Sequence, residues 1–408
     1  MSNGLSMRAM AQARLGAIEP ALLDLARAEA ELARCDDPGL RCWAHTGLGY
    51  CYLEMRLYEP ALPHMVAAQE INTSPIPLIQ APVIDLLNLA ELHLRWADEL
   101  ERVLPEDGSA EEVDGHRKEG HTHAERALTV ALGLDNPQFI ATARAVELCA
   151  RPRGTAGASL DELREAYSVV DHPDYQGSRA VVGGALARAL WTTGRQDEAL
   201  AVADESANLS QSASDWQVTA SAQWLHVEMQ ARSGVPGAEA GRSYARLLSR
   251  VLWQQRLSTL QGAYAALQVE TLHRDNVVAH RAANEDPLTG VGNRRALDEA
   301  LRAVQAEAAL ATYDVPVGLL VIDLNDFKTI NDTYGHVVGD QVLRAAATAI
   351  AAVARSNDVV ALNVGTRHGT ITLHAAVGVA TAGSGHDVGT LLAEADAAMY
   401  DAKAHPRR

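Results

Sequence analysis

Two blocks in the last third of the 408-residue chain carry residues whose types and spacing could do chemistry. The first block, DPLTGVGNRR, begins at Asp286, and the second, VIDLNDFKTINDTYGHVVGD, covers 321–340. Residues 316–323 are a continuous apolar run that ends in Asp323, which predicts a buried central strand with a carboxylate at its C-terminal edge. A carboxylate beside exposed backbone groups is a suitable Mg²⁺ ligand, and the ion would neutralise phosphate oxygens.

The two blocks together resemble the GGDEF family, the nucleotide-cyclase-like domains that condense two GTP into cyclic di-GMP. The resemblance covers about residues 285–408 and implies that Asp323 and the Leu324 carbonyl bind the metal. It implies that Asn331 and Asp340 bind the guanine edge, because a carboxylate accepts from N1–H and N2–H₂ and an amide both donates and accepts. The full set of residues that it implies for GTP binding is Phe327, Lys328, Asn331, Asp340, Lys403 and Arg407.

The Gly-Gly-Asp/Glu-Glu-Phe turn that names the family does not occur in the chain. Counted without gaps, Val364–His368 stand in its place, so that Thr366 and Arg367 replace both carboxylates. A gapped comparison is preferred, in which residues 370–383 match a later strand of the family and a strand and a helix are deleted near Leu362. In both comparisons the acidic turn is absent, so the resemblance implies no catalytic residue here.

This deletion has two expected consequences. Asp323 alone would hold Mg²⁺ weakly, since Asn325 stands at the family's second acidic position and the turn's carboxylates are missing. The backbone of 317–323 would lack a neighbouring strand unless 359–363 or 370–379 moves in. Arg355 and Asp358 match the family's regulatory site for cyclic di-GMP, although Arg355 would equally suit a solvated helix end.

The N-terminal half reads as a series of helix pairs. Segments 47–71 and 185–209 share a layout in which a helix with small residues is followed by a turn and a Glu-(Pro/Ala)-Ala-Leu start of a second helix, and a third copy begins at Glu19. Gly49, Ala61 and Ala68 would let paired helices approach closely. The pattern resembles tetratricopeptide repeats, with a plain helical bundle as the alternative.

Three regions complete the predicted organisation: a helical sensor or partner-binding domain at 1–240, a long connecting signalling helix at 241–284 and a truncated GGDEF-like domain at 285–408. The predicted fold class is an all-α helical-repeat solenoid followed by an α/β nucleotide-cyclase-like domain that lacks one strand and one helix. Residues 105–123 are polar and acidic and predict an exposed loop, which is favoured over a metal site at His116, His121 and His123.

The bulk composition restricts the partners. A net charge of −17 argues against nucleic-acid binding. No apolar run approaches the ~18 residues of a membrane span, so a cytoplasmic protein is expected. The four cysteines have no metal-like spacing and predict reduced thiols.

The leading functional prediction is a cyclic di-GMP-type signalling protein with a degenerate output domain that binds GTP, cyclic di-GMP or a protein. The alternatives are an active diguanylate cyclase, and an interaction scaffold whose C-terminal domain is vestigial. The expected cofactor is weakly bound Mg²⁺. The expected partners are a protein or peptide on the helical repeats and a second copy of the chain along the connecting helix.

Overall fold

The computed structural model describes residues 2–72, 81–103, 110–151, 158–169, 176–211, 215–310, 317–353, 364–366, 369–371, 375–382 and 388–404. It divides into two compact units, Met1–Thr271 and Leu272–Arg408. Each unit is described by itself.

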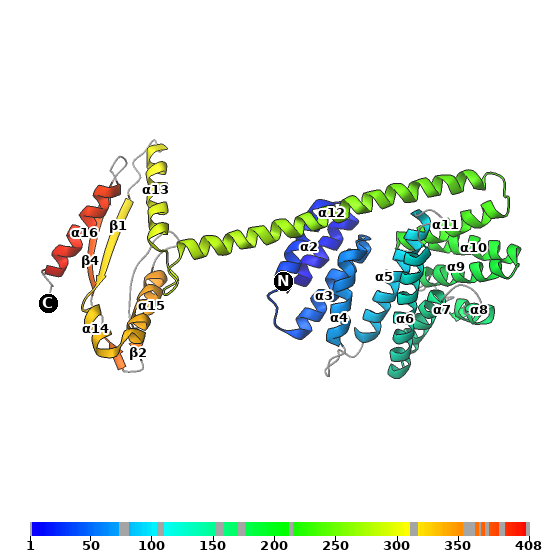
Figure 1. The fold of residues 1–408 in the computed structure, drawn as a ribbon, viewed down its shortest axis with the longest axis horizontal. Coiled ribbons are helices and arrows are strands. Elements are labelled where there is room, and N and C mark those ends of the chain that lie inside the picture. Colours follow the sequence, from blue (N-terminus) through cyan, green and yellow to red (C-terminus); the bar gives the residue numbers. More distant parts are fainter. Residues whose placement is uncertain are drawn as a thin grey trace. The chain divides into compact units, whose positions relative to one another are not determined.

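The first unit is formed by helices that pair with their neighbours in the chain (Figure 1). Its helices turn back on one another at residues with left-handed backbone, such as Gly16 and Gly194, both at φ +80. The predicted helical-repeat solenoid is therefore confirmed. The helices are α1 (Ser2–Arg14), α2 (Ile18–Leu32), α3 (Pro38–Glu54), α4 (Tyr58–Asn72), α5 (Ala81–Val103), α6 (Ala110–Leu134), α7 (Pro137–Ala150), α8 (Leu160–Val169), α9 (Gln176–Thr192), α10 (Gln196–Ser210), α11 (Trp216–Arg232) and the start of α12 (Ala238–Asn284).

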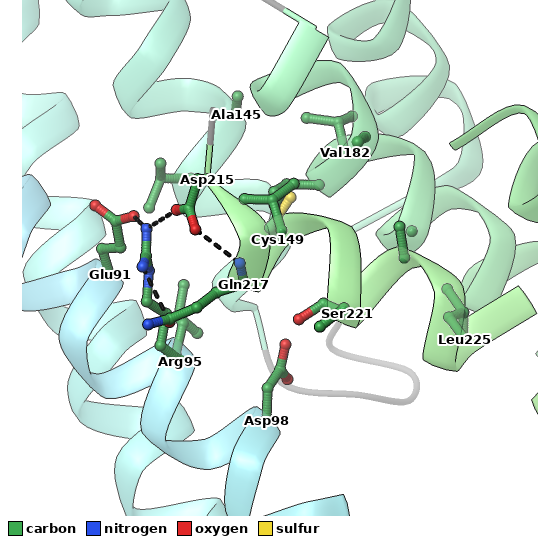
Figure 2. Close-up of a pocket in the computed structure, with 18 of the residues that line it drawn as sticks. Glu91, Arg95, Asp98, Ala145, Cys149, Val182, Asp215, Gln217, Ser221 and Leu225 are labelled. Carbon is green, nitrogen blue, oxygen red and sulfur yellow. Dashed lines mark hydrogen bonds and ion pairs between the residues drawn. The ribbon is translucent and has the colours of Figure 1, made fainter. Parts of the chain in front are cut away.

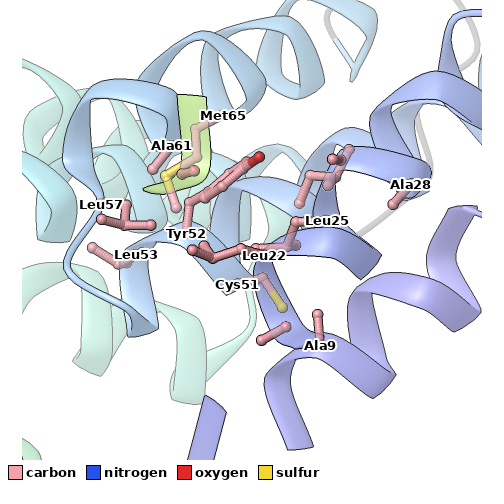
Figure 3. Packing of buried hydrophobic residues seen from close by; sticks show 14 of the residues in the cluster. Ala9, Leu22, Leu25, Ala28, Cys51, Tyr52, Leu53, Leu57, Ala61 and Met65 are labelled. Carbon is pink, nitrogen blue, oxygen red and sulfur yellow. The ribbon is translucent and has the colours of Figure 1, made fainter. Parts of the chain in front are cut away.

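Small residues let α3 and α4 approach closely. A Cβ added to Gly49 would lie 2.7 Å from Met65 Cγ and 3.4 Å from the Ala61 carbonyl oxygen. Ala61 itself is fully buried, in a core that also holds Tyr52 (Figure 3). The sequence-based expectation for these positions is confirmed.

Helix α12 is fixed to the first unit by Arg256. The Arg256 side chain is fully buried, donates to the backbone oxygen of Arg56 at 2.6 Å and pairs with Glu59. Its guanidinium also lies 4.4 Å from the ring centroid of Trp253. None of the described helices combines the length and the apolar character that a membrane crossing requires.

The prediction of an exposed loop at 105–123 is wrong, because α6 begins at Ala110 and packs along α5. Histidines of α5 and α6 form a cluster between these two helices. The polar composition of 105–123 gave no indication of it. The ring Nδ1 atoms of His93 and His116 lie 2.9 Å apart, His123 stacks on His93 and Trp96 stacks on His116. The described residues contain no group of three side chains suited to hold a metal ion.

The histidine cluster predicts a loss of stability in mild acid. Burial, and secondarily the neighbouring histidines, lower the pKa of His93 to about 4 from 6.5. As the pH falls from 7, the unfolded chain therefore takes up this proton before the native chain does. The contribution of His93 is fully present above pH 6.5 and is lost as the pH falls towards 4, with roughly 2 kcal/mol lost between pH 7 and pH 5.

We therefore expect His93→Phe, which keeps an aromatic ring but cannot ionise, to reduce the pH 7 to pH 5 loss of unfolding free energy by roughly that 2 kcal/mol. Urea unfolding followed by tryptophan fluorescence measures it, because Trp96 lies in the cluster. Exposed His273 is the control, and His273→Phe should keep the wild-type pH dependence. Equal pH dependence in wild type and His93→Phe would contradict the cluster's role.

The second unit contains the end of α12, then α13 (Arg294–Leu310), α14 (Phe327–Tyr334), α15 (His336–Val353) and α16 (Val388–Ala404), with strands β1 (Val317–Leu324), β2 (Val364–Thr366), β3 (Gly369–Ile371) and β4 (Ala375–Ala382). Strand β1 pairs antiparallel with β4 along its whole length, from Val317↔Ala382 to Leu324↔Ala375. Strands β2 and β3 form a separate hairpin. The predicted small α/β domain with a reduced sheet is confirmed.

The predicted full burial of the first strand is wrong. Helix α16 covers one face of the β1–β4 sheet (Figure 1). On this face Leu319 and Val321 pack on Leu391 and Ala395. On alternate positions Leu320 is 40% exposed and Val379 is 54% exposed. Within the part of the chain that the structure describes, β4 is the only strand beside β1. The apolar run could not reveal this, because it does not record how many strands or helices lie beside the strand.

Candidate functional site

The first sequence block, DPLTG, closes the turn between α12 and α13. Oδ1 of Asp286 accepts hydrogen bonds from Thr289 N at 2.9 Å and Thr289 Oγ1 at 2.7 Å, and Gly290 adopts φ +71. These bonds hold the pKa of Asp286 below its ordinary value. Asn293 Nδ2 also donates to the Ala283 backbone oxygen at 2.8 Å. The polar side chains of this block are therefore hydrogen-bonded within their own turn, and the candidate site lies in the second block.

Asp323 lies near the C-terminal end of β1, where the sequence predicts it. Its carboxylate accepts a hydrogen bond from the Lys403 ammonium, which is carried by the last turn of α16. Both side chains are partly open to solvent, with 40% exposure for Asp323 and 50% for Lys403. The hydrogen bond to Asp323 raises the pKa of Lys403. The structure thus brings together two of the predicted site residues as an ion pair.

A glycine lets Asn331 lie against the first turns of α15, the helix that carries Asp340. A Cβ added to Gly339 would overlap Oδ1 of Asn331 and would lie 2.9 Å from Asn331 Cγ. The Asn331 side chain therefore lies directly against the backbone of Gly339, the residue before Asp340 in the chain. Gly335, at φ +81, ends α14 and lets α15 begin at His336, so the two helices can meet. Ile330, Val338 and Val342 form the apolar contact between them.

Phe327 and Lys328 open helix α14, after Asp326 in left-handed backbone at φ +56. Phe327 packs into the contact between α14 and α15, and its ring would lie 3.4 Å from a Cβ on Gly339. Lys328 is exposed. Phe327 therefore has a packing role, while Lys328 is available to a ligand.

The remaining predicted residues have different outcomes. Leu324 ends β1 and packs on the α14–α15 contact through its side chain. Arg355, Asp358 and Arg407 lie outside the described residues, as does Leu362 near the deletion. The backbone of Thr366 belongs to β2, in the hairpin that is separate from β1. The proposed regulatory site and second basic contact thus stay predictions.

The donor set near Asp323 does not suit a magnesium ion. Mg²⁺ prefers carboxylate oxygens and near-octahedral geometry. Here Asp323 is paired with Lys403, and Asn325, two residues further along the chain, offers only a neutral amide oxygen, which is buried and has no hydrogen-bond partner in the described structure. No three acidic, histidine or cysteine side chains converge within the described ranges. The Lys403 contact, 80 residues away in the chain, was missed by sequence reasoning because no local pattern records it.

Comparison with known proteins finds a family match in the C-terminal part of the chain. Residues 283–366 match the family model described as "Diguanylate cyclase, GGDEF domain". The chain is 31% identical over 198 residues to the response regulator PleD of Caulobacter vibrioides, covering 40% of this chain and 43% of PleD. It is 40% identical over 79 residues to diguanylate cyclase DgcZ of Escherichia coli, covering 19% of this chain and 25% of DgcZ.

Among solved structures, diguanylate cyclase SiaD in complex with its activator SiaC from Pseudomonas aeruginosa matches with a TM-score of 0.34 and 25% identity, over 52% of this chain and 97% of that chain. The matched segments span less than half the length of the curated relatives PleD and DgcZ. The C-terminal part of this chain contains a GGDEF domain at residues 283–366.

Proposed function

We propose that the protein takes part in cyclic di-GMP-type signalling, and that its GGDEF domain binds a guanine nucleotide without condensing it. The observation that carries this proposal is the ion pair between Lys403 and Asp323. It places an ammonium where the resemblance expects a metal ion. The second acidic position is Asn325 and the acidic turn is absent, so the groups that would complete a metal shell are missing.

The guanine half of the site supports nucleotide binding. Asn331 lies against Gly339, the residue before Asp340 in α15, and Asp340 is only partly buried. A carboxylate and an amide together offer the acceptors and donor that the guanine edge requires. Lys328 and Lys403, both exposed, supply positive charge for phosphate oxygens. Binding of GTP would then depend on these side chains and not on Mg²⁺.

The direction in which Asp323→Asn changes the affinity for GTP separates nucleotide binding from catalysis. In Asp323→Asn, Lys403 loses its carboxylate and becomes free for a phosphate, so we expect GTP to bind about threefold more tightly, as suits a partly exposed pair. In Lys403→Met, Asp323 faces the phosphates without compensation, so we expect at least about tenfold weaker binding, or 1.4 kcal/mol. A metal-dependent cyclase would instead lose binding or turnover in Asp323→Asn.

The measurement is calorimetric titration of the full chain with GTP, in Mg²⁺ and in EDTA, with chromatography of the same mixtures for cyclic di-GMP. We expect similar affinities in both buffers and no product. Lys118→Met, an exposed lysine of α6, is the matched control and should leave the affinity unchanged. Appreciable cyclic di-GMP, or an absence of GTP binding, would each defeat the proposal.

A further inference from the structure

Arg102 of α5 is a partly buried cation that no carboxylate of the described residues neutralises. Its guanidinium donates to the neutral Ser221 Oγ of α11, its one hydrogen-bond partner within the described ranges. Arg95, two turns earlier on α5, pairs instead with both Glu91 and Asp215 (Figure 2). The remaining N–H groups of Arg102 are not among the buried atoms that lack a partner, so they are open to an arriving molecule.

A cavity of about 210 Å³ lies beside Arg102, between α5, α11 and α12. Its lining is mostly apolar. Helix α11 contributes the indole rings of Trp216 and Trp224, and α12 contributes Leu248 and Leu252. Trp216 is 50% exposed, so a molecule can reach the cavity from solvent. Because an apolar cavity of about 150 Å³ holds benzene, this one has room for an aromatic ring with a short substituent.

The charges around this cavity favour a single negative charge. Its lining holds three charged side chains, those of Arg56, Glu99 and Arg102. Arg56 and Glu99 neutralise each other through two hydrogen bonds, from Nε to Oε1 at 2.6 Å and from Nη2 to Oε2 at 2.8 Å. Arg102 therefore supplies the net positive charge of the lining, and one carboxylate would balance it.

The larger cavity on the other side of Arg102 suits a carboxylate less well. It has a volume of about 500 Å³ and lies between α5, α7, α9 and α11 (Figure 2). Four acids line it against three arginines, so an added negative charge would meet a net negative lining. The acids are Glu91, Asp98, Glu99 and Asp215, and the arginines are Arg95, Arg102 and Arg188.

The smaller cavity also touches α12 next to the place where this helix is fastened to the first unit. Arg56 Nη1 donates to the Leu252 backbone oxygen at 3.4 Å, and Leu252 lines the cavity. Arg56 itself has left-handed backbone at φ +61, which a residue other than glycine rarely adopts. A molecule in the cavity would thus contact both the Arg56 side chain and the turn of α12 that Arg56 holds.

We propose that the cavity between α5, α11 and α12 binds a small aromatic carboxylate, with its carboxylate on Arg102 and its ring against Trp216 and Trp224. A guanidinium binds a carboxylate through charge-assisted hydrogen bonds, which are roughly twice as strong as neutral ones. An aromatic ring gains further from contact with indole rings. This site lies in the first unit and is independent of the nucleotide proposal.

Ligand-observed NMR with the full chain tests the site. The probes are phenylacetate, 3-phenylpropanoate and indole-3-acetate, each compared with its neutral amide. We expect at least one acid to bind, and its amide to bind at least about tenfold more weakly, because the amide cannot balance the charge of Arg102.

Arg102→Met removes this charge and should weaken binding of the acid at least about tenfold. It should leave the affinity for the amide unchanged, whereas a variant that only disturbed the packing would weaken both. Arg195→Met, at an exposed arginine outside the cavity, is the matched control and should bind the acid as wild type does.

A second variant fills the cavity. Ala245 is a partly exposed residue of α12 that lines it, so Ala245→Trp should occupy the space and abolish binding of the acid. Ala240→Trp, at an exposed position of the same helix outside the cavity, should bind as wild type. Binding of none of the three acids, equal binding of acid and amide, or unchanged binding of the acid in Arg102→Met or Ala245→Trp would each overturn the proposal.

Discussion

Gly378→Ala is expected to open the small sheet of the GGDEF domain while the helical unit stays folded. A Cβ at this position of β4 would overlap the Ala395 carbonyl oxygen and the Met399 nitrogen, and would lie 2.7 Å from Met399 Cβ. Backbone atoms cannot rotate away as a flexible side chain can, so α16 must move off the sheet. Overpacking in a core costs about 1–3 kcal/mol and sometimes more, and we expect at least about 3 kcal/mol here.

Hydrogen exchange followed by mass spectrometry measures this effect. An opening free energy lowered by about 3 kcal/mol corresponds to at least roughly a hundredfold loss of amide protection in β1, β4 and α16. All six tryptophans lie between residues 43 and 253, so their fluorescence reports the first unit and should not change.

Gly318→Ala supplies the matched control for this change. Gly318 lies in the same sheet, opposite Thr381, and a Cβ there would meet no atom within 4 Å. Amide protection of β1, β4 and α16 in Gly318→Ala should stay within a few fold of wild type. If Gly378→Ala behaved like Gly318→Ala, α16 would not pack on β4 at the distance that the structure gives.

The success of the sequence in the first unit has a physical reason. Helix pairing there depends on local signals: a turn at Gly16 or Gly194, and small residues such as Gly49 and Ala61 at the helix crossing. Residues 105–123 lacked such a signal, because histidines score as polar whether they are solvated or stacked on one another. Burial of His93 on α5 and His116 on α6 depends on the packing of these two helices against each other, and no spacing within either helix records it.

The candidate site was only partly predictable for a similar reason. Asp323 follows an apolar run, and its place near the end of β1 follows from that run. Its partner in the fold is Lys403, which approaches because α16 covers the β1–β4 sheet. Whether a carboxylate faces a metal ion or an ammonium is thus decided by tertiary packing. The residue types alone leave both possibilities open.

Gly339→Ala is expected to weaken GTP binding at least about tenfold, or 1.4 kcal/mol, while leaving the domain folded. The new methyl group would overlap Asn331 Oδ1, so Asn331 must leave its position against α15. The guanine edge then loses one of its two proposed partners. Alanine favours a helix by about 1 kcal/mol over glycine, so α15 itself should not lose stability. Calorimetry with GTP and with ATP would show the affinity and the preference for guanine falling together.

The double variant decides whether Gly339 acts through Asn331. If the glycine only makes room for that amide, Asn331→Ala and Gly339→Ala should each weaken GTP binding similarly, and the double variant should lose little more, because residues that act as a unit are not additive. Gly115→Ala, in helix α6 with no atom within 4 Å of the added Cβ, controls for helix propensity and should leave GTP affinity unchanged. Additive losses would place the effect of Gly339 elsewhere, in the packing of Phe327 against α15 and not in the position of the guanine-binding amide.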